Sequence, residues 1–297
     1  MAGSDCHFDV TRYKRTYQSG IHWGGMNQNG RVHTALSARA RMVFPACAGV
    51  NNTYSYNTLF SAPHNCMLGG GNEGDGVDCL FEYNSFDRCG FESSDAGAFY
   101  SCGQAGTAFT NRGNVLRHSS FRNVRNAGSA GVQGITLQAI YLDDQLSGWH
   151  IHNNTFVNCQ TGTFIGGGSF NIVHDNYYEL CDTAQHFDNR GMGWEKSSCN
   201  GTAPCLTPGN GGTCTCNAAA AYHLLTGPAG AEWHARFESE LSAVLNDTKC
   251  ANENGALPCY SQVINNRYCN VTRFIDASQQ DTDSWNAVVA NNTQHCA

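Results

Sequence analysis

Three consecutive stretches between residues 139 and 191 carry the side chains best suited to acid–base chemistry. They read AIYLDDQLSGWHIHNNTFVNC, QTGTFIGGGSFNIVHDNYYELC and DTAQHFDNRG. The first contains Asp143 and Asp144 and the third contains Asp188, whereas the middle stretch has glycines at 166–168. If the stretches are stacked strands, a bare glycine floor separates two carboxylates. Such a pair could supply a general acid and a general base.

A recurring motif indicates the elements that would position these acids. SYNTLFSA, EYNSFDRC, RHSSFRNV, HNNTFVNC, HDNYYELC and INNRYCNV align on one polar anchor, which is in turn Asn57, Asn84, Ser119, Asn154, Asn176 and Asn266. Five residues after each anchor stands a small or apolar residue: Ala62, Cys89, Val124, Cys159, Cys181 and Val271. The first five anchors are 27, 35, 35 and 22 residues apart. Repeats of this length predict a solenoid of parallel strands with an inward apolar column. The anchors predict a buried ladder of amides that bond one another along the coils.

The composition supports a folded, mostly β chain of one large or two ordinary domains. Of 297 residues, 41% are apolar and 14% charged, with 33 Gly and 6 Pro, a balance that favours short strands and turns. The net charge of -7 and the lack of a basic run argue against a nucleic-acid partner. No window approaches the ~18 apolar residues of a membrane span.

Sixteen cysteines and six N-x-S/T sequons favour an oxidising, glycosylating compartment, and hence a secreted, extracellular protein. The sequons are at Asn51, Asn153, Asn200, Asn246, Asn270 and Asn291. The opening residues MAGSDCHFDV lack the apolar region of a secretion signal. We therefore expect the mature, truncated or re-engineered start of a secreted eukaryotic protein. The alternative is that the cysteines are reduced core residues.

A cysteine-rich stretch interrupts the repeat. Residues 1–190 are predicted to form solenoid coils, 191–260 an insertion, and 261–297 a final coil and tail. Six insertion cysteines predict a disulfide-stapled loop of undetermined pairing: Cys199, Cys205, Cys214, Cys216, Cys250 and Cys259. Trp233, Phe237, Leu241 and Leu245, spaced four apart, predict an amphipathic helix against the solenoid's flank. Cys159 and Cys181 are expected to be free, stacked thiols, because strands ~4.8 Å apart exceed the Cβ spacing of ~3.8 Å that a disulfide prefers.

The chain resembles the right-handed parallel β-helix repeat proteins, many of them secreted and carbohydrate-active. The resemblance runs from about Tyr13 to Val271 and is carried by PHNCMLGGGNEGDGVDCLFEYN, SSDAGAFYSCG, RGNVLRHSSFRNV, IYLDDQLSGWHIHNNTFVNC, GTFIGGGSFNIVHDN and HFDNRGMGW. Within that class it is closest to β-helical glycoside hydrolases of cell-wall glycans. It implies an all-β fold and a polysaccharide or oligosaccharide partner. Two departures from the family pattern are the absence of its N-terminal coils and the insertion after Trp194.

Strand alternation assigns directions to the side chains of the central sheet. We expect Phe99, Leu142, Phe164 and Phe187 to point inward, and Tyr100, Tyr141, Asp143, Ile165, His186 and Asp188 to face solvent. Asp143 and Asp188 would then lie two coils apart, about 9.5 Å, which favours an inverting pair. Asp188, between His186 and Arg190, suits the ionised base. Asp143, beside Asp144, suits the acid because a neighbouring like charge raises the pKa of a carboxyl.

Weaker candidates for substrate contacts surround this pair. They are Asp95, Tyr100, Tyr141, Gly166, Gly167, His186, Arg190 and Trp194. For Trp149 packing is favoured over sugar stacking, and His64 and His118 are expected to serve turns. The alternative for Asp143, Asp144 and Asp188 is that they only cap turns.

Two other functions remain open on the sequence. A polysaccharide lyase would use Arg190 or Lys196 as base, with Ca²⁺ held by Asp143, Asp144 and Asp188; otherwise we expect no metal or cofactor. A non-catalytic glycosylated surface or filament protein would self-associate through the solenoid's open end. A hydrolase should present the three aspartates in an open groove, whereas a filament subunit should bury them.

Overall fold

The computed structural model describes eleven stretches of the chain. They are residues 31–32, 35–37, 44–45, 49–69, 76–102, 112–126, 137–143, 145–188, 227–247, 258–277 and 287–296. Asp144, Arg190, Trp194, Lys196 and Asn200 lie outside them, as do Cys199, Cys205, Cys214, Cys216 and Cys250 of the insertion.

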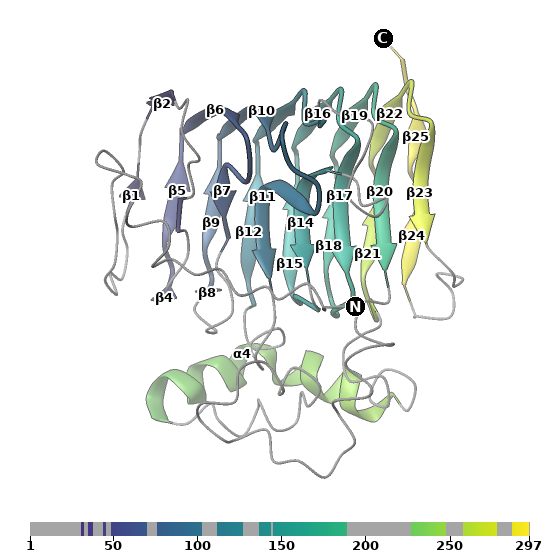
Figure 1. Cartoon of the computed structure of the whole chain (residues 1–297). Coiled ribbons are helices and arrows are strands. Elements are labelled where there is room, and N and C mark those ends of the chain that lie inside the picture. The colour runs from purple at the N-terminus through teal and green to yellow at the C-terminus, as the bar shows by residue number, and fades with distance from the viewer. Residues whose placement is uncertain are drawn as a thin grey trace, which may run out of the picture.

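Three long parallel sheets run side by side along the molecule (Figure 1). The first contains, in order, β1 (Arg31–Val32), β5 (Thr53–Ser55), β9 (Leu80–Glu82), β12 (Asn114–Arg117), β15 (Trp149–His152), β18 (Ile172–His174), β21 (Gln262–Ile264) and β24 (Val288–Ala290). The second contains β2 (Ala35–Ser37), β6 (Thr58–Ala62), β10 (Ser85–Cys89), β13 (Ser120–Arg122), β16 (Thr155–Val157), β19 (Tyr177–Glu179), β22 (Arg267–Cys269) and β25 (Thr293–Gln294). The third contains β3 (Phe44–Pro45), β7 (Met67–Leu68), β11 (Ala96–Cys102), β14 (Leu137–Asp143), β17 (Thr161–Gly166), β20 (Thr183–Asp188) and β23 (Arg273–Ala277). A short pair joins β4 (Gly49–Val50) to β8 (Gly76–Val77).

Successive strands visit the three sheets in rotation, so each coil adds one strand to each sheet. This mostly β arrangement is compatible with a parallel β-helix. After β20 the coil is interrupted, and it resumes in register when β21 pairs with β18. The residues expected to form a C-terminal tail supply two further strands, β24 and β25.

Single residues in the left-handed region turn the chain at the corners. Between the first and second sheets they are Tyr56, Tyr83, His118, Asn153, Asp175, Asn265 and Asn291, with φ between 50° and 58°. Near the ends of the second-sheet strands, or just after them, they are Ser61, Arg88, Asn123, Asn158, Leu180 and Asn270. Asn and Gly tolerate this conformation best. The sequon asparagines Asn153, Asn270 and Asn291 therefore also have a structural reason to be asparagine.

The predicted amide ladder is confirmed. The amide nitrogen of Asn57 donates to Oδ1 of Asn84 at 2.8 Å, and the same side-chain contact links Asn154 to Asn176 at 3.1 Å and Asn176 to Asn266 at 3.0 Å. Ser119 takes its place as expected, because its hydroxyl accepts from the backbone of Asn84. The ladder continues one rung further, to Asn292. Each coil is thus held to the next by buried hydrogen bonds at one corner.

The interior beneath the second sheet is a column of aromatic rings. Phe86, Phe121, Phe156 and Tyr178 stack with centroids 4.5, 5.1 and 4.5 Å apart. Parallel strands in register carry equivalent side chains at every coil, so one ring type repeated at one position produces such a stack. The stack belongs to the same core as the inward apolar column that the repeat predicted.

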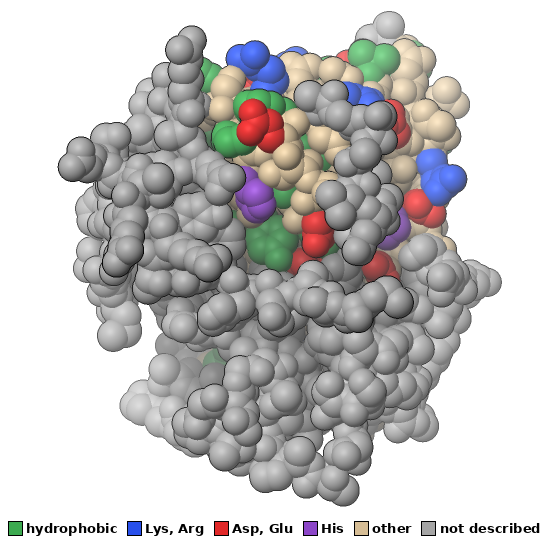
Figure 2. Space-filling model, in the orientation of Figure 1, with side chains coloured by type: hydrophobic (Ala, Val, Ile, Leu, Met, Phe, Trp, Pro, Cys, Tyr) green, Lys and Arg blue, Asp and Glu red, His purple; other side chains and the backbone are tan. Residues whose placement is uncertain are grey.

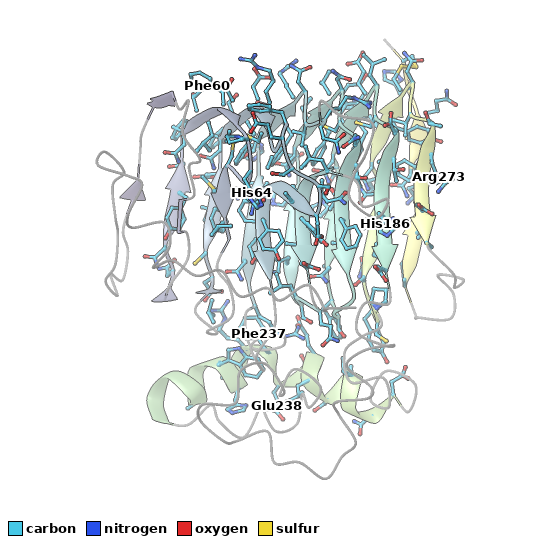
Figure 3. The ribbon with its side chains drawn as sticks, viewed as in Figure 1. Phe60, His64, His186, Phe237, Glu238 and Arg273 are labelled. Atoms are coloured by element: carbon cyan, nitrogen blue, oxygen red, sulfur yellow. A yellow bond between two sulfur atoms is a disulfide. The ribbon has the colours of Figure 1, made fainter. Side chains whose placement is uncertain are left out.

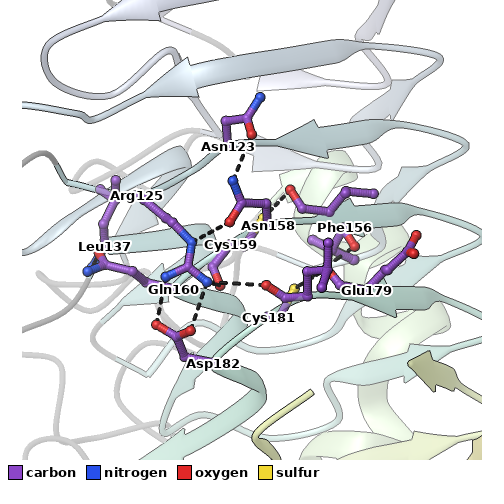
Figure 4. Close-up of polar contacts among 12 residues, drawn as sticks. Asn123, Arg125, Leu137, Phe156, Asn158, Cys159, Gln160, Glu179, Cys181 and Asp182 are labelled. Atoms are coloured by element: carbon purple, nitrogen blue, oxygen red, sulfur yellow. Dashed lines mark hydrogen bonds and ion pairs between the residues drawn. The ribbon is translucent and has the colours of Figure 1, made fainter. Parts of the chain in front are cut away.

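The cysteines divide into bonded and free. Cys66 is bonded to Cys89, and Cys269 to Cys296; Cys79 and Cys259 are also disulfide-bonded. Cys159 and Cys181 are free and buried, which confirms that prediction. They lie beneath a clamp formed by Arg125, whose guanidinium donates to the Cys159 carbonyl, the Leu180 carbonyl and the Asp182 carboxylate (Figure 4). The clamp ties three coils together.

Helix α4 (Gly227–Asn246) packs across one corner of the solenoid (Figure 1). Trp233, Phe237 and Leu241 are buried in the main core, as the spacing predicted, and Val244 is a further buried contact. Arg236 pairs with Asp78, and the fully buried Arg112 pairs with Glu240. No described helix is long and apolar enough to cross a membrane.

Candidate functional site

The outer face of the third sheet carries a row of rings and a histidine. Strand register places Tyr100, Tyr141, Phe164, His186 and Asp276 opposite one another on β11, β14, β17, β20 and β23. Tyr141 and Phe164 are buried but do not belong to the main core. The rings touch in sequence, with centroids 5.2, 4.7 and 4.5 Å apart. The row therefore forms a small second cluster on the outside of the sheet.

The directions predicted for β17 were wrong by one residue. Phe164 was expected to point inward and Ile165 outward, but Phe164 pairs with Tyr141, and Ile165 lies in the core opposite Leu142. Both residues are apolar, so the alternation of hydrophobicity gives no direction here. Phe164 points outward because it packs between Tyr141 and His186. Phe99, Leu142 and Phe187 lie in the core as predicted.

Asp143 and Asp188 share one column of this face. Asp188 lies opposite Gly166, and Asp143 directly follows Leu142, which lies opposite Ile165. One strand with a glycine therefore separates the two acids, as expected from the sequence. Two strand spacings amount to about 9.5 Å, close to the upper limit of roughly 6.5–9.5 Å for an inverting pair of carboxyls.

Two tyrosines hold two of the aspartates in a crossed arrangement. Tyr100 on β11 donates its hydroxyl to Oδ2 of Asp143 on β14, and Tyr141 on β14 donates to Oδ1 of Asp95, just before β11, both at 3.0 Å. The rings are nearly perpendicular, at 87°. Each tyrosine thus fixes an acid of the other coil, and Asp95 is a partner of Tyr141 as well as a turn residue at φ 54°.

The solvent exposure expected for the residues of this face was wrong for Asp143 and Tyr141. Asp143 is only 2% exposed and Tyr141 is fully buried, whereas Tyr100, His186 and Asp188 reach solvent partly. Asp143 points away from the core, but it is enclosed, and its carboxylate accepts a hydrogen bond from the Tyr100 hydroxyl. Within the described residues, the acids are therefore unequal, with one enclosed and one accessible.

The glycines do not form an open floor. Gly166, Gly167 and Gly168 are buried, and Gly167 and Gly168 have φ of 75° and 79°. A Cβ at Gly168 would lie 2.0 Å from the carbonyl oxygen of Leu146. The backbone N–H of Gly167 also donates to the backbone carbonyl of Asp188 at 2.9 Å. The glycines are required by a tight turn packed against the neighbouring coil, so Gly167→Val would strain the fold rather than test ligand binding.

A histidine, an acid and an arginine lie close together at the β23 end of the row; His186 and Arg273 are labelled in Figure 3. Nδ1 of His186 lies 3.4 Å from Oδ2 of Asp276, and Nη1 of Arg273 lies 2.8 Å from the same oxygen. The sequence interpretation missed Asp276 and Arg273, which come after the insertion. A signal was available, because Phe164, His186 and Asp276 each stand ten residues after a ladder asparagine, namely Asn154, Asn176 and Asn266.

The face shows a mixed chemical character in the space-filling view (Figure 2). Acidic, histidine and apolar side chains of described residues reach the surface over the third sheet, with basic side chains at its margin. Among the described residues, no group of three or more His, Cys, Asp or Glu is arranged to hold a metal ion.

The other sequence candidates lie away from this face or serve the fold. Trp149 is buried and packs 5.6 Å from Phe99, so the packing interpretation is confirmed. His118 occupies a left-handed corner, and the carbonyl of His64 accepts from Gly90 in a turn. Asn51, Asn153, Asn246, Asn270 and Asn291 are all exposed. None of these five belongs to a strand of the third sheet.

Comparisons of the chain with protein-family models, with curated proteins and with solved structures found no match.

Proposed function

We propose that the protein is a secreted right-handed parallel β-helix that binds an extended polysaccharide across the outer face of the third sheet and hydrolyses it as a glycoside hydrolase. The observation that carries the proposal is the common column of Asp143 and Asp188, separated by one glycine-bearing strand. The right hand follows from the strong preference for right-handed crossovers between parallel strands.

The inequality of the two acids supports different roles for them. Asp188 is partly exposed and takes the proton of an attacking water. Asp143, enclosed and held by Tyr100 at 3.0 Å, donates a proton to the leaving glycosidic oxygen. The separation of about 9.5 Å leaves room for the water and favours inversion at the sugar carbon.

The placement of disulfides and sequons supports secretion and the choice of face. Two bonded cysteine pairs tie coils together, as is usual in oxidising compartments. The five exposed sequon asparagines stand at corners or on α4. Glycans at these positions would leave the outer face of the third sheet accessible to a polymer.

The test is a hydrolysis screen of the secreted protein on cell-wall polysaccharides, followed by Asp143→Asn and Asp188→Asn. Each substitution should lower turnover by about 10²- to 10⁴-fold, because an amide can neither donate nor accept the catalytic proton. Asp182→Asn is the matched control, since Asp182 is an exposed partner of Arg125 at another corner. Turnover that survives both site substitutions would contradict the proposal.

A hydrolase was expected to present Asp143 in an open groove, so the burial of Asp143 counts against the hydrolase and favours a second candidate, a non-catalytic structural, surface or filament-forming protein. An acid that is 2% exposed and bonded to Tyr100 also suits a purely architectural role in a packed outer cluster. On that alternative, wild-type protein hydrolyses none of the polysaccharides, and Asp143→Asn lowers the thermal stability of the protein.

A further inference from the structure

The last coil of the solenoid leaves one edge of each long sheet unpaired. Within the described residues, β24, β25 and β23 are the final strands of the first, second and third sheets, and each pairs on one side only. The disulfide between Cys269 and Cys296 fixes the end of this coil to the preceding one. Helix α4 lies along the side of the solenoid rather than across this end (Figure 1). The end is therefore a strand edge of fixed conformation, which is a template for a further strand.

The core is also incomplete at this end. Val289 occupies the inward position of β24 opposite Val263, which is fully buried. Val289 is nevertheless 39% exposed, and the neighbouring Val288 is 48% exposed. Tyr268 is only partly buried, whereas Tyr178, opposite it on the preceding coil, is fully buried. Apolar surface that the preceding coil buries is therefore left in contact with water at the last one.

The asparagine ladder stops at this end with one rung unfilled. At each described rung the backbone N–H of the anchor donates to a side-chain oxygen of the next coil, as from Asn266 to Asn292 at 2.9 Å. Among the described residues, none accepts from the backbone N–H of Asn292 or of Asn291. The N–H of Asn265, one coil earlier, donates to the carbonyl of Ala290. A further coil would satisfy both donors, with a side-chain oxygen and a backbone carbonyl.

The opposite end of the same chain has the strand arrangement of such a coil. Strands β1, β2 and β3 stand at the other ends of the same three sheets and run parallel to their neighbours. When the register of the first two sheets is extended by one coil, Val289 comes opposite Val32, and Thr293 comes opposite Ala35. A second copy in the same orientation therefore continues each sheet with parallel strands.

The sequence of this first coil also supplies the group that the last rung lacks. Thr34 directly precedes β2, as Asn57 directly precedes β6. A hydroxyl already serves in the ladder, because Oγ of Ser119 accepts from the backbone N–H of Asn84 at 3.1 Å. A threonine at the corresponding point of a second copy is therefore a suitable acceptor for Asn292.

We propose that the end formed by β23, β24 and β25 binds the end formed by β1, β2 and β3 of a second copy of this chain. The two surfaces are different, so the contact is heterologous and successive copies add in line. The inference goes beyond the proposed hydrolysis and does not depend on it. It gives the filament-forming candidate a defined interface.

The first measurement is the oligomeric state of the full chain by sedimentation velocity at increasing concentration. N-glycans are removed enzymatically beforehand, because the Asn291 sequon adjoins the edge. Wild-type protein should associate, and Val289→Lys should weaken the association about tenfold or more, because it places an unpaired charge in the contact. Leu180→Lys is the matched control, since Leu180 is 49% exposed at a corner on the side of the solenoid. It should leave the association unchanged.

Cross-linking identifies which ends meet. The extended register places Val288 opposite Arg31 of the next copy, on strands about 4.8 Å apart. A short bis-maleimide should therefore join Val288→Cys to Arg31→Cys in a mixture of the two variants, and neither variant to itself. The wild-type chain is the control for native thiols, of which Cys159 and Cys181 are buried.

The outcomes separate this inference from the proposed reaction. A chain that stays monomeric at every concentration overturns the inference, and so does association that Val289→Lys leaves intact. Cross-linking of Val288→Cys to itself would show a tail-to-tail pair and would also overturn it. Head-to-tail association of wild-type protein that hydrolyses no polysaccharide removes the hydrolase and keeps the inference. Hydrolysis by a strictly monomeric protein does the reverse.

Discussion

At the scale of single residues, left-handed corners are the conformational cost of this fold. Each coil must turn several times, and the turn is made by one residue whose φ lies near 55°. Asn123, Asn153 and Asn158 adopt this left-handed conformation at little cost in free energy. For Tyr83 and Leu180, whose side chains make no local hydrogen bond to the backbone, the same conformation costs roughly 1–2 kcal/mol.

Leu180→Asn should therefore stabilise the protein. Leu180 has φ 55° and is 49% exposed, so little apolar burial is lost. We expect the free energy of unfolding to rise by about 0.5–1 kcal/mol, measured by urea denaturation. Val288→Asn is the control, because Val288 is similarly exposed but lies in strand β24, where asparagine is unfavourable. Equal effects of the two substitutions would refute the conformational explanation.

The residues that could be predicted are those whose signal repeats at every coil. The ladder asparagines and the free thiols Cys159 and Cys181 were predicted because strand register fixes equivalent positions. The direction of Phe164 could not be predicted, since its neighbours are apolar on both sides. The glycine turn and the enclosure of Asp143 depend on contacts between coils, and the partnership of Asp276 with His186 is hidden by the insertion between them.

At the scale of elements, the adjacent strands β12, β15 and β18 bring basic groups together in the middle of the first sheet. The ring of His152 stacks on His174 at 4.7 Å and lies 6.0 Å from His118. Burial, followed by the charge of His174 and of Arg117, lowers the pKa of His152 to about 4. The pKa of His150 is lowered by burial and by His174. Because these histidines occupy neighbouring positions on adjacent coils, the stability of this cluster should depend on pH.

The stability of the fold should fall as the pH is lowered from about 6.5 towards 4. An unfolded histidine has a pKa near 6.5, above the folded value for His152, so the unfolded chain binds more protons in this interval. The stabilisation is complete above pH 6.5 and is lost on acidification. Urea midpoints at successive pH values should show this slope, and His152→Gln should flatten it. His234→Gln, on α4, is the control, and an unchanged slope in His152→Gln would contradict the argument.

At the scale of the whole molecule, one buried ion pair links α4 to the solenoid. Arg112, which precedes β12, is fully buried and pairs with Glu240, while its guanidinium lies 5.7 Å from the ring of Phe170. Burial lowers the pKa of Arg112 to about 10, although Glu240 acts in the opposite direction. Phe170 stacks on Tyr260, whose hydroxyl donates to Asp247 at 3.0 Å. Docking of the helix therefore combines apolar packing with a charge that requires its partner.

Glu240→Gln should destabilise the protein by about 3 kcal/mol, because it leaves a buried guanidinium without its counter-charge. The value is at the lower end of the usual range since the side chain of Glu240 is 32% exposed and so is partly screened by solvent. The double variant Arg112→Met/Glu240→Gln should lose less than the single one, because an apolar side chain replaces the uncompensated charge. Urea denaturation of the four proteins in this cycle gives the coupling energy. Glu238→Gln, an exposed change on the same helix, should stay within about 0.5 kcal/mol of wild type. Additive effects of the two substitutions would show that the Arg112–Glu240 pair does not contribute to holding α4.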